Sequence, residues 1–421
     1  MSRDRSTRSS KEVTGVSKTR EAMPSIARPD IPPAPSLRKR LRRTLLRWYA
    51  GVQRDVPWRR TDDPYRILVA EYMSQQTQLE RVRAYYERFL QRFPDIQALA
   101  RASLQDVLKA WEGLGYYARA RYLHEAARQI VREYGGRIPD DPAHLLALPG
   151  CGPYTAAAIA SIAFGRPVPV LDGNVRRVLC RMLTLDEDPR RPAAERKLRA
   201  FVEALIAEED SEGGAREINQ ALMDLGALIC RPRAPQCEHC CWRFACRARQ
   251  LASPTAFPVK SASPKRPHYE IAVGVIWRDP PACNRASSSR SAKAHRDSES
   301  EVLIARRREE GLLGGLWEFP GGKRERGESL RRCCAREIEE EVGIRVRVGR
   351  KIMTIRHAYS HFRITMHVFE CWPVEGSPRP LGCQEVRWVR CSQLSRYPFP
   401  AANRKIIEAL RKADLRTNRR A

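Results

Sequence analysis

Two carboxylates occupy positions that could support acid chemistry. Glu71 follows Ile67 by four residues and Leu68 by three, so a helix would place its carboxyl group on an apolar face. A carboxyl group in a poorly solvated pocket has a raised pKa and can donate a proton near neutral pH. Asp172 precedes an apolar helical pattern, where the plainer interpretation is an N-cap. We regard the two as a candidate proton donor and a candidate stabilising carboxylate.

A cysteine array is the second feature with chemical potential. The chain has 13 cysteines, and we expect it to work in a reducing compartment, where disulfides are rare. Four of them, Cys230, Cys237, Cys240 and Cys246, form a C-x6-C-x2-C-x5-C array whose thiolates could surround one metal centre. The spacing alone leaves both a zinc ion and an iron–sulfur cluster open.

A glycine turn is the third feature, because it could hold phosphate. Residues 145–152 predict the end of a helix and a turn on Gly150 and Gly152, and Pro153 suits the first turn of the next helix. Backbone amides at such an N-terminus can bind phosphate. Most Gly-x-Gly turns are only turns, but the net charge of +28, from 77 Lys and Arg against 49 Asp and Glu, favours a polyanionic partner. Nucleic acid is the leading interpretation, ahead of an anionic membrane.

The chain lacks the signals of a membrane or secreted protein. It contains no run of the roughly 20 apolar residues that a transmembrane helix needs. Its N-terminus is basic but has no apolar stretch typical of a secretory signal. We therefore expect no membrane partner and a cytoplasmic location with the bacterial nucleoid, while a nuclear or organelle address in the basic segment stays open. We also expect a monomer.

The elements that must position these residues begin with a helical domain. Residues 1–36 are basic, rich in Ser, Thr and Pro, and without hydrophobic periodicity, so we expect a disordered arm. Residues 37–252 carry apolar side chains at helical spacing, and β-branched alternating runs are scarce. This pattern predicts an all-α domain.

The remainder of the chain predicts a different architecture. Residues 253–268 contain four prolines, which favours a stiff linker without regular elements. Residues 269–415 alternate in polarity and predict an α+β domain with short strands around one helix near 329–341. We expect residues 279–300, rich in Ser, Ala and Arg, to form a flexible insertion between the first two strands.

Several segments together resemble the MutY adenine glycosylase family, within the helix-hairpin-helix superfamily of endonuclease III. The resemblance spans about residues 55 to 250. It is carried by the glycine turn, the cysteine array and the segments 57–59, 71–77, 111–121, 171–175 and 219–227.

The resemblance implies a fold and a cofactor. It implies a multidomain protein with an all-α helix-hairpin-helix glycosylase domain that holds a 4Fe-4S cluster at the four cysteines rather than zinc, followed by an α+β Nudix-like domain. Bifunctional lyases of the superfamily carry a lysine where this sequence has Tyr154. We therefore expect a monofunctional glycosylase, with an endonuclease III-like enzyme for oxidised pyrimidines as the runner-up.

The resemblance also implies a mechanism. Glu71 would protonate N7 of an extruded adenine, and the Asp172 carboxylate would stabilise the oxocarbenium-like sugar. Asn174 and Tyr154 would position these groups. The expected substrate is double-stranded DNA with adenine opposite 8-oxoguanine or guanine, where extrusion is cheaper than in a matched pair.

Five further residues are expected to contact DNA. By resemblance, Gln76 and Tyr116 would wedge into the base stack, and Arg59 lies in a family segment. Gly150 and Gly152 would present backbone amides to phosphate.

The C-terminal domain contains an intact Nudix box, which starts at Gly322 and ends near Gly343. Its acidic residues Glu337, Glu340 and Glu341 stand at i, i+3 and i+4 of a helix, so their oxygens could share one face and hold Mg²⁺, or form only a solvated face. MutY C-terminal domains generally recognise 8-oxoguanine without hydrolysing nucleotides. A Nudix hydrolase and a lesion-binding protein with an inert glycosylase site are the rival classes.

Recognition of the lesion has its own candidate residues. The segment 356–362 resembles the Phe-Ser-His loop with which the family contacts 8-oxoguanine. Tyr359 stands in place of Phe, and Ser360 and His361 are retained. The same residues would also suit an ordinary strand.

Overall fold

The computed structural model describes residues 31–208, 213–259, 266–279, 299–359 and 361–418, without the side chains of 413–418. Several sequence predictions lie outside these residues: the disordered arm up to residue 30, linker residues 260–265, residues 280–298 of the insertion, and Ser360.

The first domain is helical, as the apolar spacing predicts. Its helices are α1 (Pro35–Val52), α2 (Pro64–Ser74), α3 (Leu79–Arg92), α4 (Ile96–Arg101), α5 (Leu104–Ala110), α6 (Ala118–Tyr134), α7 (Pro142–Leu146), α8 (Pro153–Phe164), α9 (Gly173–Leu183), α10 (Pro192–Ile206), α11 (Ala215–Asp224) and α12 (Arg247–Gln250). Short 3-10 helices occupy Pro57–Arg59, Cys237–His239 and Pro254–Ala256, and Leu225–Ile229 forms a π-helical turn. The turn at Pro254–Ala256 lies in the proline-rich linker, where the sequence predicts no regular element.

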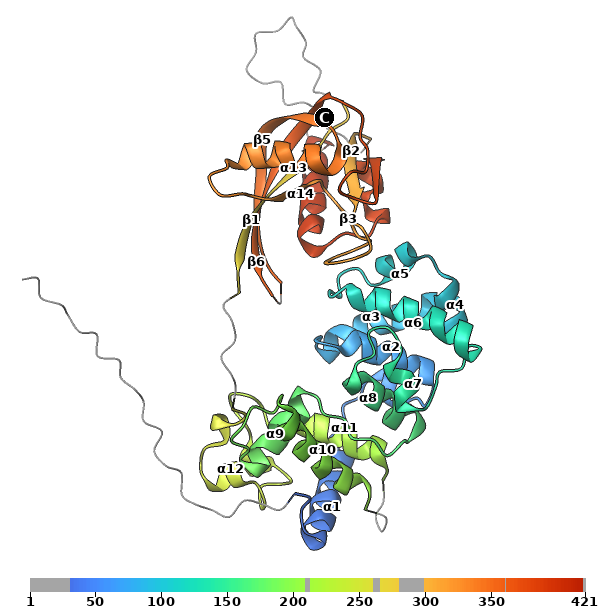
Figure 1. Ribbon diagram of the computed structural model, residues 1–421, viewed down its shortest axis with the longest axis vertical. Helices are drawn as coiled ribbons and strands as arrows, with labels where there is room; N and C mark the ends of the chain where they lie inside the picture. The colour runs from blue at the N-terminus through green and yellow to red at the C-terminus, as the bar shows by residue number, and fades with distance from the viewer. Residues whose placement is uncertain (1–30, 209–212, 260–265, 280–298, 360, 419–421) are drawn as a thin grey trace, which may run out of the picture.

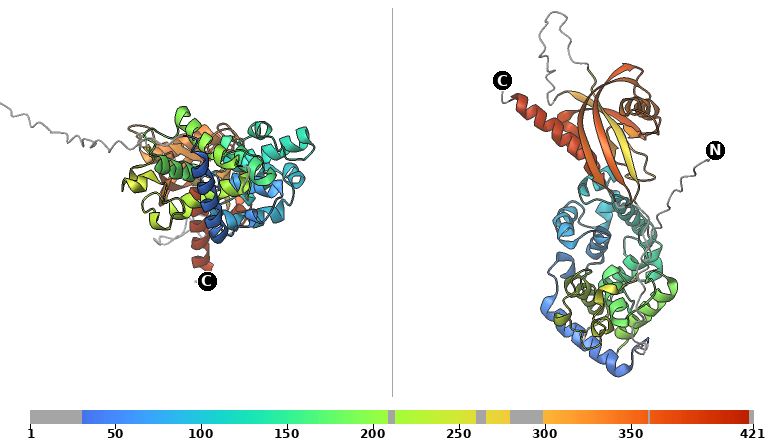
Figure 2. Two further views of the ribbon diagram at one scale, coloured as in Figure 1. Left: turned by 90° about the horizontal axis from the view of Figure 1, so that it is seen from below. Right: turned by 90° about the vertical axis from the view of Figure 1, so that its left-hand side faces the viewer.

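Two hydrophobic cores divide this domain into lobes. One core is formed by helices α2 through α8 and includes Trp111 and Phe89. The other joins α1 to α9, α10 and α11 around Trp242 and Phe201. The first helix of the chain therefore packs against the later helices, at the end of the molecule farthest from the C-terminal domain (Figures 1 and 2). Helices α2 and α8 contribute side chains to both cores and lie at the junction of the lobes.

The second domain contains two sheets and two helices. Its strands are β1 (His268–Ile276), β2 (Glu301–Arg306), β3 (Trp317–Glu318), β4 (Gly321–Lys323), β5 (Arg345–Ala358), β6 (Arg363–Glu375) and β7 (Glu385–Arg390). Its helices are α13 (Leu330–Val342) and α14 (Ala401–Asn418), with a 3-10 turn at Cys391–Arg396. The sheet orders are β4-β1-β6-β5, in which β1 and β6 are parallel, and β3-β2-β7, which is antiparallel.

Alternation along β1 decides which helix each face of the sheet contacts. Val273 and Val275 belong to the core that includes α14, whereas Ala272 and Ile276 belong to the core under α13. Gly274 also lies under α13, because a Cβ there would come within 2.6 Å of Ile338. The sequence predicts one helix and short strands. The structure corrects both, since α14 covers the second face and β5 and β6 have 14 and 13 residues.

The two domains are in direct contact through α5, α6 and the turn between them. Leu316 of the second domain belongs to the core of the first lobe. Gln105 on α5 donates to the Gly315 carbonyl at 2.8 Å and accepts from the Trp317 indole at 3.0 Å. The Tyr117 hydroxyl donates to the Phe399 carbonyl at 3.2 Å. These contacts place the C-terminal domain and the two helical lobes along one arc (Figure 1).

Within the described residues, no helix is both long and apolar enough to cross a membrane.

Candidate active site and metal centre

Glu71 lies at the junction of the two lobes, buried in the last part of α2. The Tyr154 hydroxyl, near the start of α8, donates a hydrogen bond to Glu71 Oε2 at 3.3 Å. Burial raises the pKa of Glu71 to about 7, and the charge of Asp172 adds to the rise, against the lowering effects of Tyr154 and Arg59. The carboxyl group is thus poised to hold and release a proton near neutral pH.

Asp172 is the N-cap of α9, as its sequence position predicts. The Val175 amide donates to Asp172 Oδ1 at 2.6 Å, and the Asn174 side chain donates to Oδ2 at 2.8 Å. Burial raises the pKa of Asp172 above its ordinary value, while the bonds from Val175 and Asn174 oppose the rise. The N-cap role and a role in chemistry are therefore compatible, because two donors orient the carboxylate beside Glu71.

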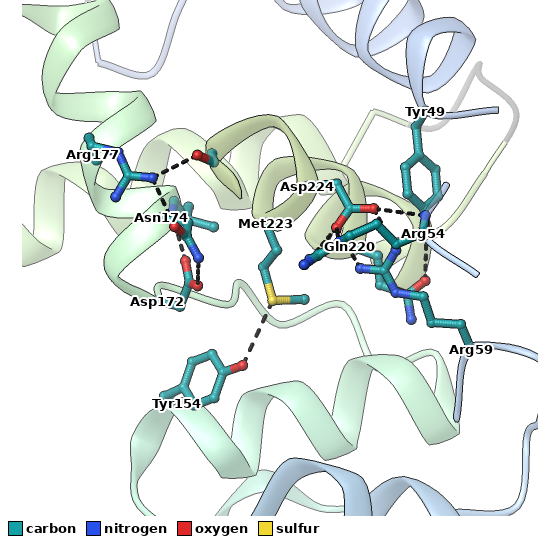
Figure 3. A network of polar contacts seen from close by, with 12 residues as sticks. Tyr49, Arg54, Arg59, Tyr154, Asp172, Asn174, Arg177, Gln220, Met223 and Asp224 are labelled. Atoms are coloured by element: carbon teal, nitrogen blue, oxygen red, sulfur yellow. Dashed lines mark hydrogen bonds and ion pairs between the residues drawn. The ribbon is translucent and has the colours of Figure 1, made fainter. Parts of the chain in front are cut away.

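A buried ion-pair network that sequence reasoning did not identify flanks this pair (Figure 3). Asp224, at the end of α11, is fully buried and binds two guanidinium groups. Arg54 Nε donates to Asp224 Oδ1 at 2.6 Å, and Arg59 Nη2 donates to the same oxygen at 2.8 Å. The sequence signal was an acidic residue that directly follows the apolar run Ala221–Met223.

Arg59 needs a correction. We predicted a contact with DNA, but its side chain is 6% exposed and its guanidinium faces Asp224. A side chain so enclosed is not presented to a DNA backbone. Its charge instead acts on Glu71, whose pKa it lowers.

Arg177 on α9 connects the site with the cysteine loop. It donates to Asn174 Oδ1 at 2.8 Å and, through Nε, to the Cys230 carbonyl at 2.7 Å. Asn174 is therefore held in place from the side opposite to Asp172 (Figure 3).

The glycine turn joins α7 to α8 as predicted, with Pro153 in the first turn of α8. Gly150 has a φ of +70°, and a Cβ there would come within 2.6 Å of Tyr122, so only glycine fits. Gln75 Nε2 donates to the Gly150 carbonyl at 3.2 Å and so ties the turn to the end of α2. Gly152 is the exposed N-cap of α8, where backbone amides point outward.

The two predicted wedge residues are exposed and share an unusual backbone conformation. Gln76 has a φ of +56° and Tyr116 a φ of +50°. L-residues other than Gly, Asn and Asp seldom adopt this conformation, and it persists only where the surrounding structure imposes it. Tyr116 is 42% exposed although it is a large aromatic residue.

The four cysteines of the array line a single cavity, together with Arg181, Ile229 and Gln236. The Cys230 thiol accepts from Arg181 Nη1 at 3.3 Å. Among the described residues, no three Cys, His, Asp or Glu side chains are spaced for one metal ion. A single zinc ion would draw four sulfurs to about 2.3 Å from one point. Four thiols around one cavity could hold either a zinc ion or an iron–sulfur cluster.

Family models match both domains of the chain. Residues 69–204 match the HhH-GPD superfamily of base excision DNA repair proteins. Residues 293–409 match the NUDIX domain.

Curated relatives extend the match over most of the chain. The chain is 32% identical to the adenine DNA glycosylase of Rattus norvegicus over 87% of this chain and 77% of that protein. The chain belongs to the adenine DNA glycosylase family. It is also 36% identical to the Homo sapiens enzyme, over 78% of this chain and 66% of that one, and 44% identical to the Mycobacterium tuberculosis (strain H37Rv) enzyme, over 48% of this chain and 67% of that one.

Membership of the adenine DNA glycosylase family confirms the predicted enzyme class and the order of a helix-hairpin-helix domain and a Nudix-like domain. Glycosylases related to endonuclease III typically carry an iron–sulfur cluster.

The three acids of the Nudix box have separate partners in this glycosylase. Glu341 accepts from the Gly321 amide at 3.0 Å, whereas Arg336 Nη1 donates to Glu337 at 3.1 Å and to Glu340 at 3.0 Å. Glu337 also lies against Gly322, where a Cβ would come within 1.9 Å of its carboxylate. Among the described residues no three carboxylates are spaced for one ion, and Mg²⁺ binding by the box stays a hypothesis.

The predicted lesion-reading residues lie at the tip of the β5–β6 hairpin. Tyr359 donates its amide to the Phe362 carbonyl at 2.8 Å and packs on the rings of His357 and Phe362 at 4.6 Å and 4.9 Å. His361 is exposed. Tyr359 is half-buried, and Ser360 lies outside the described residues.

Proposed function

We propose that this glycosylase removes adenine opposite 8-oxoguanine or guanine in double-stranded DNA, as a monofunctional enzyme of base excision repair. The observation that carries the proposal is the buried Glu71 carboxyl group, with a pKa near 7, hydrogen-bonded by Tyr154 and next to the oriented carboxylate of Asp172. Tyr154 bonds to Glu71 and Asn174 bonds to Asp172, and neither side chain carries an amine that could form a Schiff base.

The chemistry requires one proton and one anionic stabiliser. Glu71 gives its proton to N7 of the extruded adenine, and the bond between N9 and C1′ breaks with its electron pair going to the base. The Asp172 carboxylate stabilises the positive charge that develops on the sugar. Water then adds to C1′ and returns a proton to the Glu71 carboxylate, so that atoms and charge balance.

A 4Fe-4S cluster at Cys230, Cys237, Cys240 and Cys246 is the second part of the proposal. When bound, the cluster would cross-link the loop that follows α11 and stabilise the folded state. Arg177 and Arg181 donate to the Cys230 carbonyl at 2.7 Å and 3.3 Å, so this loop is held next to α9 and to Asp172 at its start. To test this, iron would be removed with a chelator. Visible absorbance would follow the loss of iron, and thermal unfolding would measure the accompanying loss of stability.

Recognition of 8-oxoguanine is assigned to the β5–β6 hairpin. The exposed His361 and the half-buried Tyr359 stand at its tip, and Ser360 lies between them in sequence. Polar side chains next to aromatic rings suit a base that must be both stacked and hydrogen-bonded.

An excision assay tests the function. Duplexes with adenine opposite 8-oxoguanine, guanine, cytosine or thymine are incubated with the enzyme, and strand cleavage is measured after alkali. We expect excision opposite 8-oxoguanine and guanine only. Absence of adenine release from every duplex would overturn the proposal, and a borohydride-trapped DNA adduct would reassign the chain to the lyases.

A second assay tests the hairpin. His361→Ala and Tyr359→Ala should reduce the preference for 8-oxoguanine over guanine and leave the excision rate opposite guanine nearly unchanged. The matched control is His357→Ala on β5, which packs on Tyr359 from within the strand. Loss of excision opposite both bases would refute a role in reading the lesion.

Location and oligomeric state stay predictions: a monomer in the cytoplasm, with the nucleoid.

A further inference from the structure

Arg119 is a buried charge near the start of α6 that the proposed chemistry does not use. Its side chain is 6% exposed, and none of the ion pairs among the described residues includes it. A buried guanidinium without a carboxylate is costly unless its five donors are all satisfied. The acceptors that it does use are therefore informative.

Among the described residues, all of the acceptors of Arg119 are backbone carbonyls, and they come from two separate segments. On one side, Nη1 reaches the end of α2, at 2.6 Å from the Met73 oxygen and 2.6 Å from the Gln75 oxygen. It also lies 3.2 Å from the Tyr72 oxygen. These carbonyls belong to the last turn and C-cap of α2, which lack partners within the helix and favour a positive charge.

On the other side, the same guanidinium holds the turn between α5 and α6. Nη2 donates to the Gly115 carbonyl at 3.0 Å, and Nε donates to the Tyr116 carbonyl at 3.4 Å. The carbon of the guanidinium also lies 5.2 Å from the centre of the Tyr116 ring and 5.4 Å from that of Trp111.

Gln76 follows Gln75 and Tyr116 follows Gly115, and both are exposed residues with positive φ. One guanidinium thus bonds to the backbone immediately before Gln76 and at Tyr116. The Trp111 indole also donates to the Gly115 carbonyl at 3.1 Å, and the Thr77 amide donates to the Ser74 carbonyl at 3.2 Å. These bonds each hold one turn, whereas Arg119 bonds to both segments.

We propose that Arg119 is a positioning residue for base extrusion: it fixes the spacing between Gln76 and Tyr116, so that both side chains enter the base stack together. This inference rests on the proposed function. It assigns Arg119 to the step before Glu71 acts, and it predicts a defect in extrusion rather than in the chemistry.

Arg119→Lys tests it, because lysine keeps the charge but is a single point donor that cannot span five carbonyls. The matched control is Arg42→Lys in the other lobe, where another buried arginine donates to the carbonyls of Leu205 and Ile206. Both variants should lose stability, but only Arg119 contacts the two wedge segments. Thermal unfolding establishes the folded fraction of each.

Extrusion is measured in a Glu71→Gln background with 2-aminopurine as the target base, whose fluorescence rises when it leaves the stack. We expect R119K to abolish most of that rise and to lower the single-turnover excision rate of the otherwise unaltered enzyme by roughly tenfold or more, since small misplacements are costly. The affinity for a duplex that carries an abasic analogue should change less than about threefold, because such a duplex has no base to extrude.

Three outcomes are decisive. Wild-type fluorescence in R119K, or a loss in R119K that R42K matches at equal folded fraction, would overturn the proposal. The proposal would also be overturned if R119K weakened binding to the abasic duplex as strongly as it lowered the excision rate, since a general loss of DNA affinity is not a positioning effect. Failure of the unaltered enzyme to release adenine would instead refute the proposed function.

Discussion

Each domain contains a glutamate whose pKa burial raises, yet the two sites differ in what surrounds the carboxyl group. The pKa of Glu71 in the helical domain rises to about 7, and that of Glu341 in the Nudix-like domain to about 8. Glu71 accepts from the Tyr154 side chain and has the carboxylate of Asp172 nearby. Glu341 accepts from the Gly321 backbone amide.

The difference shows that a raised pKa alone does not define a catalytic acid. Glu71 has a second carboxylate that two donors orient, so a proton can be given while charge is stabilised beside it. Among the neighbouring carboxylates, Glu318 contributes most to the raised pKa of Glu341. Arg307 binds Glu318 at 2.7 Å and so neutralises its charge. Glu341 therefore serves to hold the loop between β3 and β4 on α13.

The largest effect on excision is expected when Glu71 can no longer donate a proton. Glu71→Gln should lower single-turnover excision on the order of 10³-fold or more, because the amide cannot protonate adenine. Duplex binding should persist, since Glu71 is buried. Glu80→Gln, an exposed glutamate on α3, is the control and should retain the wild-type rate. Undiminished excision by E71Q would remove Glu71 from the mechanism.

The pH dependence of excision sharpens the same contrast. Glu71 must be protonated to act, so the rate should be constant below its pKa of about 7 and fall by about tenfold per pH unit above it. The measurement is single-turnover excision between pH 5.5 and 9. A rate that rises through pH 7 would show that the reactive form is the carboxylate.

The free energy of unfolding should also decrease as pH rises, because of Glu71. Its folded-state pKa of about 7 exceeds its ordinary value of 4.5, so its contribution is complete below pH 4.5 and is lost as pH rises through 7. Relative to E71Q, the wild type should lose roughly 3 kcal/mol of unfolding free energy between pH 4.5 and 8. Urea unfolding at several pH values measures this, and a parallel pH dependence in both proteins would contradict the raised pKa.

Glu341→Gln should have a much smaller effect. At pH 7 Glu341 is mostly protonated, and the glutamine keeps an oxygen that can accept from Gly321. We expect excision within about twofold of wild type and a stability change below about 1 kcal/mol. Incubation of the wild type with 8-oxo-dGTP and Mg²⁺ should release no pyrophosphate. Hydrolysis that E341Q abolishes would make the second site catalytic too.

A similarly small effect is expected where the two domains meet. Gln105→Ala removes the bonds to Gly315 and Trp317 and should weaken domain docking by about 1 kcal/mol. We expect the preference for 8-oxoguanine over guanine to fall by less than about twofold, because only part of that docking energy is felt at the lesion. The control is Gln129→Ala on α6, whose side chain bonds to Glu133 within the same helix. If Q105A retained the wild-type preference for 8-oxoguanine over guanine, docking of the domains would not influence recognition of the lesion.

Local pattern was sufficient for much of the site. The Asp172 cap, the turn at Gly150 and the helix that carries Glu71 all depend on residues within a few positions of each other, and the structure has each of them. The pattern failed for α14, whose apolar face becomes intelligible only once it covers the second face of the sheet.

Arg59 and Arg119 mark the limit of sequence reasoning. An arginine reads as a surface charge in sequence, yet Arg59 turns inward to Asp224, 165 positions later. Arg119 turns inward to carbonyls of α2, 44 to 47 positions earlier. Sequence spacing does not encode such pairings, because they depend on how whole helices pack.

The sequence by itself determined the family motifs, the candidate proton donor and the array of four cysteines, since each is a matter of residue type and short spacing. Only the tertiary structure decided that Glu71, Tyr154 and Asp172 meet at the junction of two lobes, which burial of separate helices brings together. It also decided which donors the Nudix acids bind, because the Gly321 amide meets Glu341 only when β4 packs on α13.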